Sequence, residues 1–162
     1  ELGAVYVLGD FEVVQRGDRW TIVPAARYGP LRNWQALGAP FYPWEMKYAK
    51  RFKVNGVAGK SYYVKADRWT GSLVEVWVNG RKAGIVFAEP YTLDVTPFVR
   101  KGKNDVELRV VGNMENLIGP HHVAYDGIVD PNRWNVPQLR KASEYFLTPF
   151  GLQEDFALVE CE

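Results

Sequence analysis

The stretch SLVEVWVNGRKAGIVFAEPYTLDVTPFVRKGKNDVELRVVG, residues 72–112, decides the fold of this chain. Three valines at its start alternate with Glu75 and Trp77, which is the period-two pattern of a strand with one buried face. Asn79 and Gly80 follow, and both tolerate the positive φ angles that a tight hairpin needs. The stretch therefore predicts a β-hairpin, with Trp77 on the face opposite the valines.

The rest of the stretch continues in the same way. Residues 83–87 form the predicted return strand, and residues 91–96 a short extended piece after Pro90. A turn at residues 101–104 leads into a second alternating strand. In this strand Val106, Leu108 and Val110 point inward, whereas Asp105, Glu107 and Arg109 point outward.

Short strands separated by turn signals are predicted along most of the chain. Outside the deciding stretch they cover residues 4–8, 11–14, 20–23, 46–54, 61–66, 144–147 and 155–159. Helix is predicted only as single turns, such as Gln138–Ala142. Eight or more short alternating strands are typical of an all-β fold, so we predict one antiparallel β-sandwich of jelly-roll type over residues 1–162.

Several motifs of the deciding stretch resemble a known family. They are Val78-Asn79-Gly80, Gly84, Pro90-Tyr91, Asp94-Val95-Thr96 and Gly102-Lys103-Asn104. A looser match includes Leu8-Gly9-Asp10-Phe11, Asn116 with Gly119-Pro120-His121-His122, and Pro149-Phe150-Gly151-Leu152. The pattern is similar to the galactose-binding-like β-sandwich of the β-galactosidase/β-glucuronidase superfamily and of α-L-rhamnosidase-type enzymes. The resemblance implies an all-β fold and a carbohydrate context.

Composition and charge exclude several classes of function. Hydrophobic residues make up 47% of the chain and charged residues 24%, which is ordinary for a globular domain. The net charge of +1 provides no basic surface for nucleic acid or an anionic membrane. No apolar run reaches the ~20 residues of a membrane span. We therefore expect neither nucleic acid nor membrane as a partner.

The single cysteine, Cys161, excludes an internal disulfide and a cysteine-based zinc site, but it leaves the cellular compartment open. The chain begins without Met in a predicted strand. We therefore expect a domain of a longer polypeptide, and the resemblance implies a secreted bacterial enzyme that is extracellular or on the cell surface.

Aromatic residues are unusually frequent, at six Trp, nine Tyr and eight Phe. Many fall in the two long irregular segments, residues 24–44 and 113–137, which should meet at one end of a jelly roll. Because pyranose rings pack on flat aromatic rings, we expect a carbohydrate site there. The candidate residues in these segments are Trp34, Tyr42, Trp44, His121, His122, Tyr125 and Trp134, beside the polar Arg32, Asn33, Asn116 and Asp126. Trp69 beside Arg68 is a third candidate place. For each ring, packing in the protein interior is the competing interpretation.

The adjacent histidines His121 and His122 suggest a metal site, but neighbours on an extended segment point to opposite sides. A packed histidine and a sugar contact are the two alternatives. Related sandwiches often hold structural calcium, for which Glu12, Asp155 and Glu160 are candidate ligands. No organic cofactor is expected.

Motifs for catalysis are missing from the sequence: it has no Gly-x-Ser-x-Gly, no phosphate-binding glycine loop and no His-Glu-x-x-His. Two of the 19 carboxylates could form a glycosidase pair, but a sequence does not show which ones meet. Together with the surplus of aromatic rings in the loops, the resemblance implies a non-catalytic module that binds polysaccharide for an appended glycoside hydrolase. The alternative is a structural domain that packs on the catalytic domain without a sugar site. The sequence does not identify the sugar.

Overall fold

The computed structural model describes residues 5–26, 29–119 and 145–161. Its strands are β1 (Phe11–Arg16), β2 (Arg19–Pro24), β3 (Glu45–Val54), β4 (Ser61–Lys65), β5 (Trp69–Thr70), β6 (Leu73–Val78), β7 (Arg81–Val86), β8 (Thr92–Asp94), β9 (Gly102–Val111), β10 (Gly151–Leu152) and β11 (Ala157–Cys161). Among these residues, helix occurs as the 3-10 turn η1 (Thr96–Phe98) and the short α1 (Glu115–Ile118). None of the described helices is long and apolar enough to cross a membrane.

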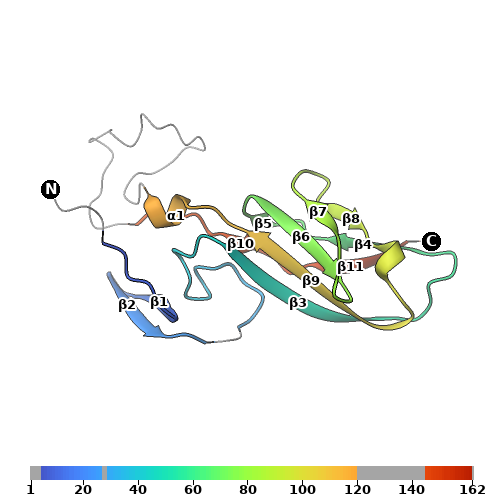
Figure 1. The fold of residues 1–162 in the computed structure, drawn as a ribbon, viewed down its shortest axis with the longest axis horizontal. Coiled ribbons are helices and arrows are strands. Elements are labelled where there is room, and N and C mark those ends of the chain that lie inside the picture. Colours follow the sequence, from blue (N-terminus) through green and yellow to red (C-terminus); the bar gives the residue numbers. More distant parts are fainter. Residues whose placement is uncertain (1–4, 27–28, 120–144, 162) are drawn as a thin grey trace.

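Two antiparallel sheets form a β-sandwich. One has the strand order β3-β9-β6-β7, and the other has the order β11-β4-β8. Strands β5 and β10 make a small additional pair, and β1 and β2 form a separate hairpin. Figure 1 shows this hairpin near one end of an elongated molecule, on the side where α1 lies, with β8 and β11 toward the other end.

The core lies between the two sheets and follows directly from the alternation in the sequence. On β9, Val106, Leu108 and Val110 are buried, and their neighbours along the strand face outward. The valines of β6 and the inward side chains of β4, Tyr62 and Val64, complete the same cluster. Each strand thus removes one row of apolar side chains from water, at roughly 25 cal/mol per Å² of buried surface.

The deciding stretch also contains a buried polar residue that fixes a turn. Asn104 is fully buried, and its amide nitrogen donates to the carbonyl of Arg100 at 2.7 Å. Its side-chain oxygen accepts hydrogen bonds from the Arg100 N–H and the Asn79 amide, both at 2.9 Å. Asn79 itself has a φ of 51° at the hairpin turn. Asn104 therefore joins the turn before β9 to the turn between β6 and β7.

The β1–β2 hairpin is attached to the sandwich by rings and by one backbone bond. Trp20 lies 5.7 Å from Phe41 and 5.9 Å from Tyr145, measured between ring centroids. The N–H of Val13 donates to the carbonyl of Gly38 at 2.7 Å. Part of the aromatic excess therefore serves to hold an element that has little core of its own.

The prediction of an all-β antiparallel sandwich is confirmed, and so is each strand of the deciding stretch. Two predicted strands are wrong: their described residues, 5–8 and 145–147, are not in strand. Residues 5–8 are four consecutive apolar residues and are largely exposed, so they have no sheet face to pack on, while Tyr145 packs its ring on Trp20 and Phe41. The helical turn predicted at Gln138–Ala142 lies outside the described residues.

Candidate functional site

Trp34 occupies the centre of the sandwich end that is formed by the segment 29–44. Its side chain is 1% exposed and packs against Phe150 at 5.6 Å and Tyr42 at 5.8 Å. A Cβ atom at Gly112 or Gly151 would lie within 2.6 Å of its ring, so the indole fits only because these positions are glycine. No ring face is left for a sugar, and the prediction of Trp34 as a stacking platform is wrong. It is a core residue.

Asn116 ties together three segments at this end of the sandwich. Its amide nitrogen donates to the carbonyl of Pro40 at 2.8 Å and to that of Thr148 at 2.7 Å. Its side-chain oxygen accepts the N–H of Thr148 at 2.9 Å. Asn116 is buried. Its polar side chain therefore builds the scaffold of the loops, as a buried amide with several partners does.

Trp44 lies on this scaffold immediately before β3 and is 61% exposed. Its carbonyl accepts the N–H of Gly112 at 2.6 Å, which holds the start of β3 beside the end of β9. A hollow of about 320 Å³, which we call the end hollow, opens there. It is lined by Pro43, Trp44, Glu45, Val111, Gly112, Asn113 and Met114. The two long segments thus meet at one place, with an exposed ring from the first and a polar amide from the second.

Tyr42 lies two residues before Trp44, and its exposure is between that of the buried Trp34 and that of Trp44. It is 39% exposed, and its ring meets Trp34 edge-on. Burial of the hydroxyl raises the pKa of Tyr42, and the negative charge of Glu45 raises it further. The phenol therefore stays protonated at neutral pH and can both donate and accept a hydrogen bond.

Trp69 does not join the end hollow. It pairs through β5 with Leu152 of β10, packs against the core, and meets Tyr91 edge-on at 5.7 Å. Its indole N–H is buried and has no hydrogen-bond partner among the described residues. The neighbouring Arg68 forms an ion pair with Glu154 at 2.6 Å. Trp69 therefore packs against the core and does not contribute to the surface around Trp44.

The other predicted sugar-contacting residues, His121, His122, Tyr125 and Trp134, lie outside the described residues, as does Asp126. Of the remaining polar candidates, Asn33 pairs its backbone with Gly151 and Arg32 contributes its carbonyl to the hydroxyl of Tyr48. That His121, His122, Tyr125 or Trp134 forms the opposing wall of a sugar site remains a prediction.

The three candidate calcium ligands do not come together in one site. Glu12 accepts the N–H of Ala26 at 2.5 Å, Asp155 pairs with Lys50 at 2.6 Å, and Glu160 accepts the hydroxyl of Tyr62 at 2.7 Å. In the part of the chain that the structure describes, no three Asp, Glu, His or Cys side chains gather as metal ligands. Each of the three carboxylates instead has a separate partner.

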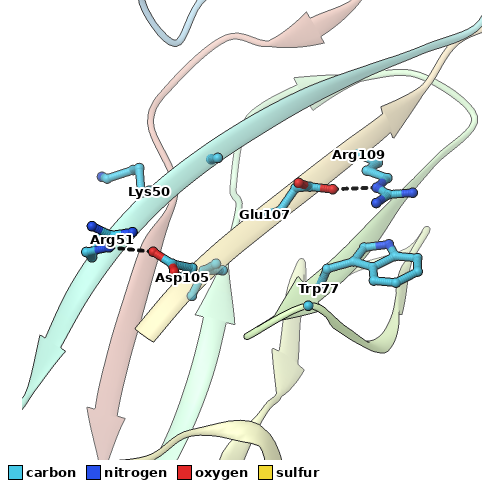
Figure 2. A pocket seen from close by; sticks show the side chains of 9 residues that line it. Lys50, Arg51, Trp77, Asp105, Glu107 and Arg109 are labelled. Atoms are coloured by element: carbon cyan, nitrogen blue, oxygen red, sulfur yellow. Dashed lines mark hydrogen bonds and ion pairs between the residues drawn. The ribbon is translucent and has the colours of Figure 1, made fainter. Parts of the chain in front are cut away.

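A second hollow lies on the outer face of the four-stranded sheet, which carries Trp77. This sheet-face hollow has a volume of about 360 Å³ and is lined by Ala49, Lys50, Arg51, Trp77, Gly80, Asp105, Val106, Glu107 and Arg109. Figure 2 shows its charged side chains and Trp77 rising from neighbouring strands. The alternation predicted that Trp77 faces away from the buried valines of its strand, and that Asp105, Glu107 and Arg109 face outward on theirs. It did not predict that β9 lies between β3 and β6 in one sheet, which brings these side chains together.

Charges at the sheet-face hollow are paired across and along the strands. Arg51 bonds Asp105 at 2.6 Å, and Arg109 bonds Glu107 at 2.5 Å (Figure 2). The hydrogen bond from the Arg51 guanidinium holds the pKa of Asp105 below its usual value. The Arg109 guanidinium also lies 4.1 Å from the centre of the Trp77 ring, a cation–π contact. The indole N–H of Trp77 donates to Glu75 at 3.0 Å.

Comparison with known proteins finds similar sequences and folds in glycoside hydrolases. A protein of Formosa agariphila named "Putative beta-glucuronidase" is 30% identical over 129 aligned residues, and the match covers 75% of this chain. The solved rhamnosidase from Novosphingobium sp. PP1Y matches 93% of this chain with 26% identity and a TM-score of 0.59. The resemblance to a glycoside-hydrolase β-sandwich is confirmed. The solved Bifidobacterium dentium beta-glucuronidase, complexed with coumarin-3-O-glucuronide, shares the fold at 19% identity, with a TM-score of 0.51 over 86% of this chain.

This glycosidase-associated β domain corresponds to a small part of those enzymes. It spans 11% of the Formosa protein, 14% of the rhamnosidase and 24% of the beta-glucuronidase. No family model matches the chain. The comparisons therefore support the fold and its association with glycosidases.

Proposed function

We propose that this chain is a non-catalytic, carbohydrate-binding β-sandwich of a secreted bacterial glycoside hydrolase. It holds polysaccharide for the catalytic domain of the same enzyme and needs no organic cofactor. The observation that carries the proposal is the exposed Trp44 ring at the end hollow, beside Asn113 and Met114. An aromatic face takes the C–H surface of a sugar, and nearby amide and carboxylate groups bind its hydroxyls.

The rigid frame beneath Trp44 supports this assignment. Its backbone is held by Gly112, and the segment before it rests on buried Trp34 and on Asn116. A ring on such a frame loses little conformational freedom when a ligand stacks on it, so more of the contact energy appears as affinity. The small share of each relative that the chain matches agrees with an accessory, non-catalytic role.

Affinity electrophoresis through soluble polysaccharides tests the proposal. We expect retardation of the 162-residue chain in at least one gel, and a loss of about 5- to 150-fold in affinity for Trp44→Ala, by analogy with base–aromatic stacking at about 1–3 kcal/mol. Phe87→Ala is the matched control, because this ring is 69% exposed and lies outside both hollows. Equal retardation of all three proteins would contradict the assignment of the end hollow.

A structural domain that packs on the catalytic domain is the second candidate. It is favoured by the exposed apolar side chains Tyr42, Met114 and Ile118 near the same end, which a neighbouring domain would cover. This candidate predicts no retardation by any polysaccharide and a loss of stability of the whole enzyme for Met114→Asp. Release of product from aryl-glycosides by the pure chain would contradict both candidates.

A further inference from the structure

The sheet-face hollow is separate from the end hollow in place and in chemistry. Its floor is a row of residues that the strand register sets side by side: Ala49 of β3 lies opposite Glu107 of β9, which lies opposite Trp77 of β6. The Arg51–Asp105 pair occupies the adjacent position along β3 and β9. The end hollow, in contrast, lies where β3 begins and β9 ends.

Small side chains create the space in this hollow. Ala49 is exposed and ends at its Cβ, whereas its neighbours on the same face of β3 are the long Lys47 and Arg51. Gly80, at the turn after β6, contributes no side chain next to Trp77. The resulting volume of about 360 Å³ is at the lower end of the range for ligand pockets, roughly 300–1,000 Å³.

The walls of the hollow offer donors, acceptors and a ring without a net charge. Arg51 and Arg109 provide N–H donors, and Asp105 and Glu107 provide acceptors, so two positive charges balance two negative charges. Lys50 is already bonded to Asp155 and to the carbonyl of Phe156. Arg109 covers one face of the Trp77 ring at 4.1 Å and fixes its orientation. The hollow is therefore lined by the Trp77 ring in a fixed orientation and by two ion pairs that offer both donors and acceptors.

We propose that the sheet-face hollow is a second carbohydrate site, selective for a neutral glycan. It rests on the proposed function for the class of ligand, but it uses a different surface. Hydroxyl groups both donate and accept, so vicinal hydroxyls of a sugar can bond carboxylate and guanidinium together while each ion pair stays formed. The C–H face of the sugar packs on Ala49 and Trp77.

The same charge balance disfavours an acidic glycan. A uronate or sulfate group would have to displace Asp105 or Glu107 from its arginine, and it would then leave a carboxylate facing another negative charge. A neutral ligand meets no such cost, and its affinity depends little on salt because no charges are brought together. The site is therefore predicted to discriminate between neutral and acidic polysaccharides.

Amide and indole NMR spectra of the chain, titrated with galactomannan, hydroxyethyl cellulose and polygalacturonate fragments, test this proposal. The chain has six tryptophans, and the Trp77 and Trp44 indole signals are assigned by their loss in Trp77→Phe and Trp44→Phe. We expect the Trp77 signal to shift with a neutral glycan, and its midpoint to change less than about 2-fold between 0.05 and 0.5 M NaCl.

Ala49→Gln provides the decisive variant, because it fills the hollow from an exposed position without touching the core. We expect at least a 5-fold weaker midpoint for the Trp77 signal, whereas Lys53→Gln, on the same face of β3 and outside the hollow, changes nothing. A Trp44 shift with an unchanged Trp77 signal overturns this second site and leaves the proposed function in place. A Trp77 shift only with polygalacturonate overturns the neutral selectivity. No shift at either ring with any glycan overturns both proposals.

Discussion

Trp34 and Trp44 stand ten positions apart in one aromatic-rich segment, yet they have opposite environments, at 1% and 61% exposed. Both lie in a segment that also holds prolines, glycines and other rings. The difference comes from contacts with distant residues, because Trp34 donates its backbone N–H to Phe150 and fills the space above Gly112 and Gly151. The residue type therefore made both rings candidates for a sugar site, and only their positions in the folded chain distinguish the buried ring from the exposed one.

This difference predicts opposite effects on stability. Trp34→Ala should lower the free energy of unfolding by about 3–5 kcal/mol, because it leaves a large cavity between packed groups. Trp44→Ala should change it by less than about 0.5 kcal/mol, because most of its ring is already in water. Urea denaturation followed by circular dichroism measures both. Equal losses for the two variants would show that Trp44 is part of the core.

Tyr48 gives a pH-dependent prediction at the same scale. Burial raises the pKa of its hydroxyl from 10.0 to about 12, although the N–H of Leu152 bonds to it. Between these two values the folded state keeps a proton that the unfolded state has lost, so the stabilisation is complete below pH 10 and is lost as the pH rises toward 12.

The loss of stability between pH 9 and pH 11 should therefore be smaller in Tyr48→Phe than in the parent chain, as measured by urea midpoints at each pH. Tyr6→Phe, which removes a hydroxyl from an exposed ring, is the control and should keep the loss of the parent. A Tyr48→Phe variant with an unchanged loss would assign the alkaline sensitivity to other groups.

At the scale of elements, the two-residue strand β10 depends on a glycine. Gly151 has a φ of +96°, and a Cβ there would lie 2.2 Å from the hydroxyl oxygen of Tyr48 and 2.6 Å from the Trp34 ring. The strand pairs with β5 and its backbone also bridges to Asn33. Gly151 therefore joins the C-terminal part of the chain to both the loop 29–44 and the sandwich.

Gly151→Ala should destabilise the fold more than Gly59→Ala. Gly59 also has a positive φ, +70°, but no atom lies within 4 Å of its Cβ position. In Gly59→Ala the free energy of unfolding should fall by about 1–2 kcal/mol, because alanine disfavours a left-handed backbone. In Gly151→Ala it should fall by about 1–3 kcal/mol more, because the added methyl group overpacks the core. Thermal melts of both variants measure the difference, and equal melting temperatures would contradict the close packing around Gly151.

At the scale of the whole molecule, surface carboxylates make the free energy of unfolding depend on pH in the acidic range. Hydrogen bonds from Arg51, Lys82 and Lys60 lower the pKa values of Asp105, Glu75 and Glu160, respectively. The folded state then binds fewer protons than the unfolded state, so this stabilisation is present above the ordinary values of 3.8 and 4.5 and is lost as the pH falls below them.

The melting temperature should accordingly fall when the pH is lowered from 5 to 3, with a smaller fall in Asp105→Asn than in the parent. Lys101→Gln, an exposed change just before the same strand that removes no charge acting on Asp105, is the control. Scanning calorimetry at several pH values tests this. A melting temperature that stays constant down to pH 3 would show that these ion pairs add nothing to stability, as exposed pairs often do.

The amino-acid sequence by itself determined the class of fold, the deciding hairpin and the face on which each strand residue lies. Alternation with a period of two fixes which side chains of β6 and β9 share a face, because the geometry of an extended chain is local. The Asn79-Gly80 turn is equally local. At residues 5–8 and 145–147 the β-favouring residue types predicted strands that are not formed, since a strand also needs a partner with free backbone groups.

Only the tertiary structure decided which aromatic rings are exposed and where the two hollows lie. Burial of Trp34 depends on Phe150 and Gly151, far along the chain, and the end hollow depends on the bond between Trp44 and Gly112. The sheet-face hollow depends on the register that sets Ala49, Glu107 and Trp77 in one row across three strands. These positions depend on the packing of segments that are distant in the sequence, and the alternation within a single strand does not predict them.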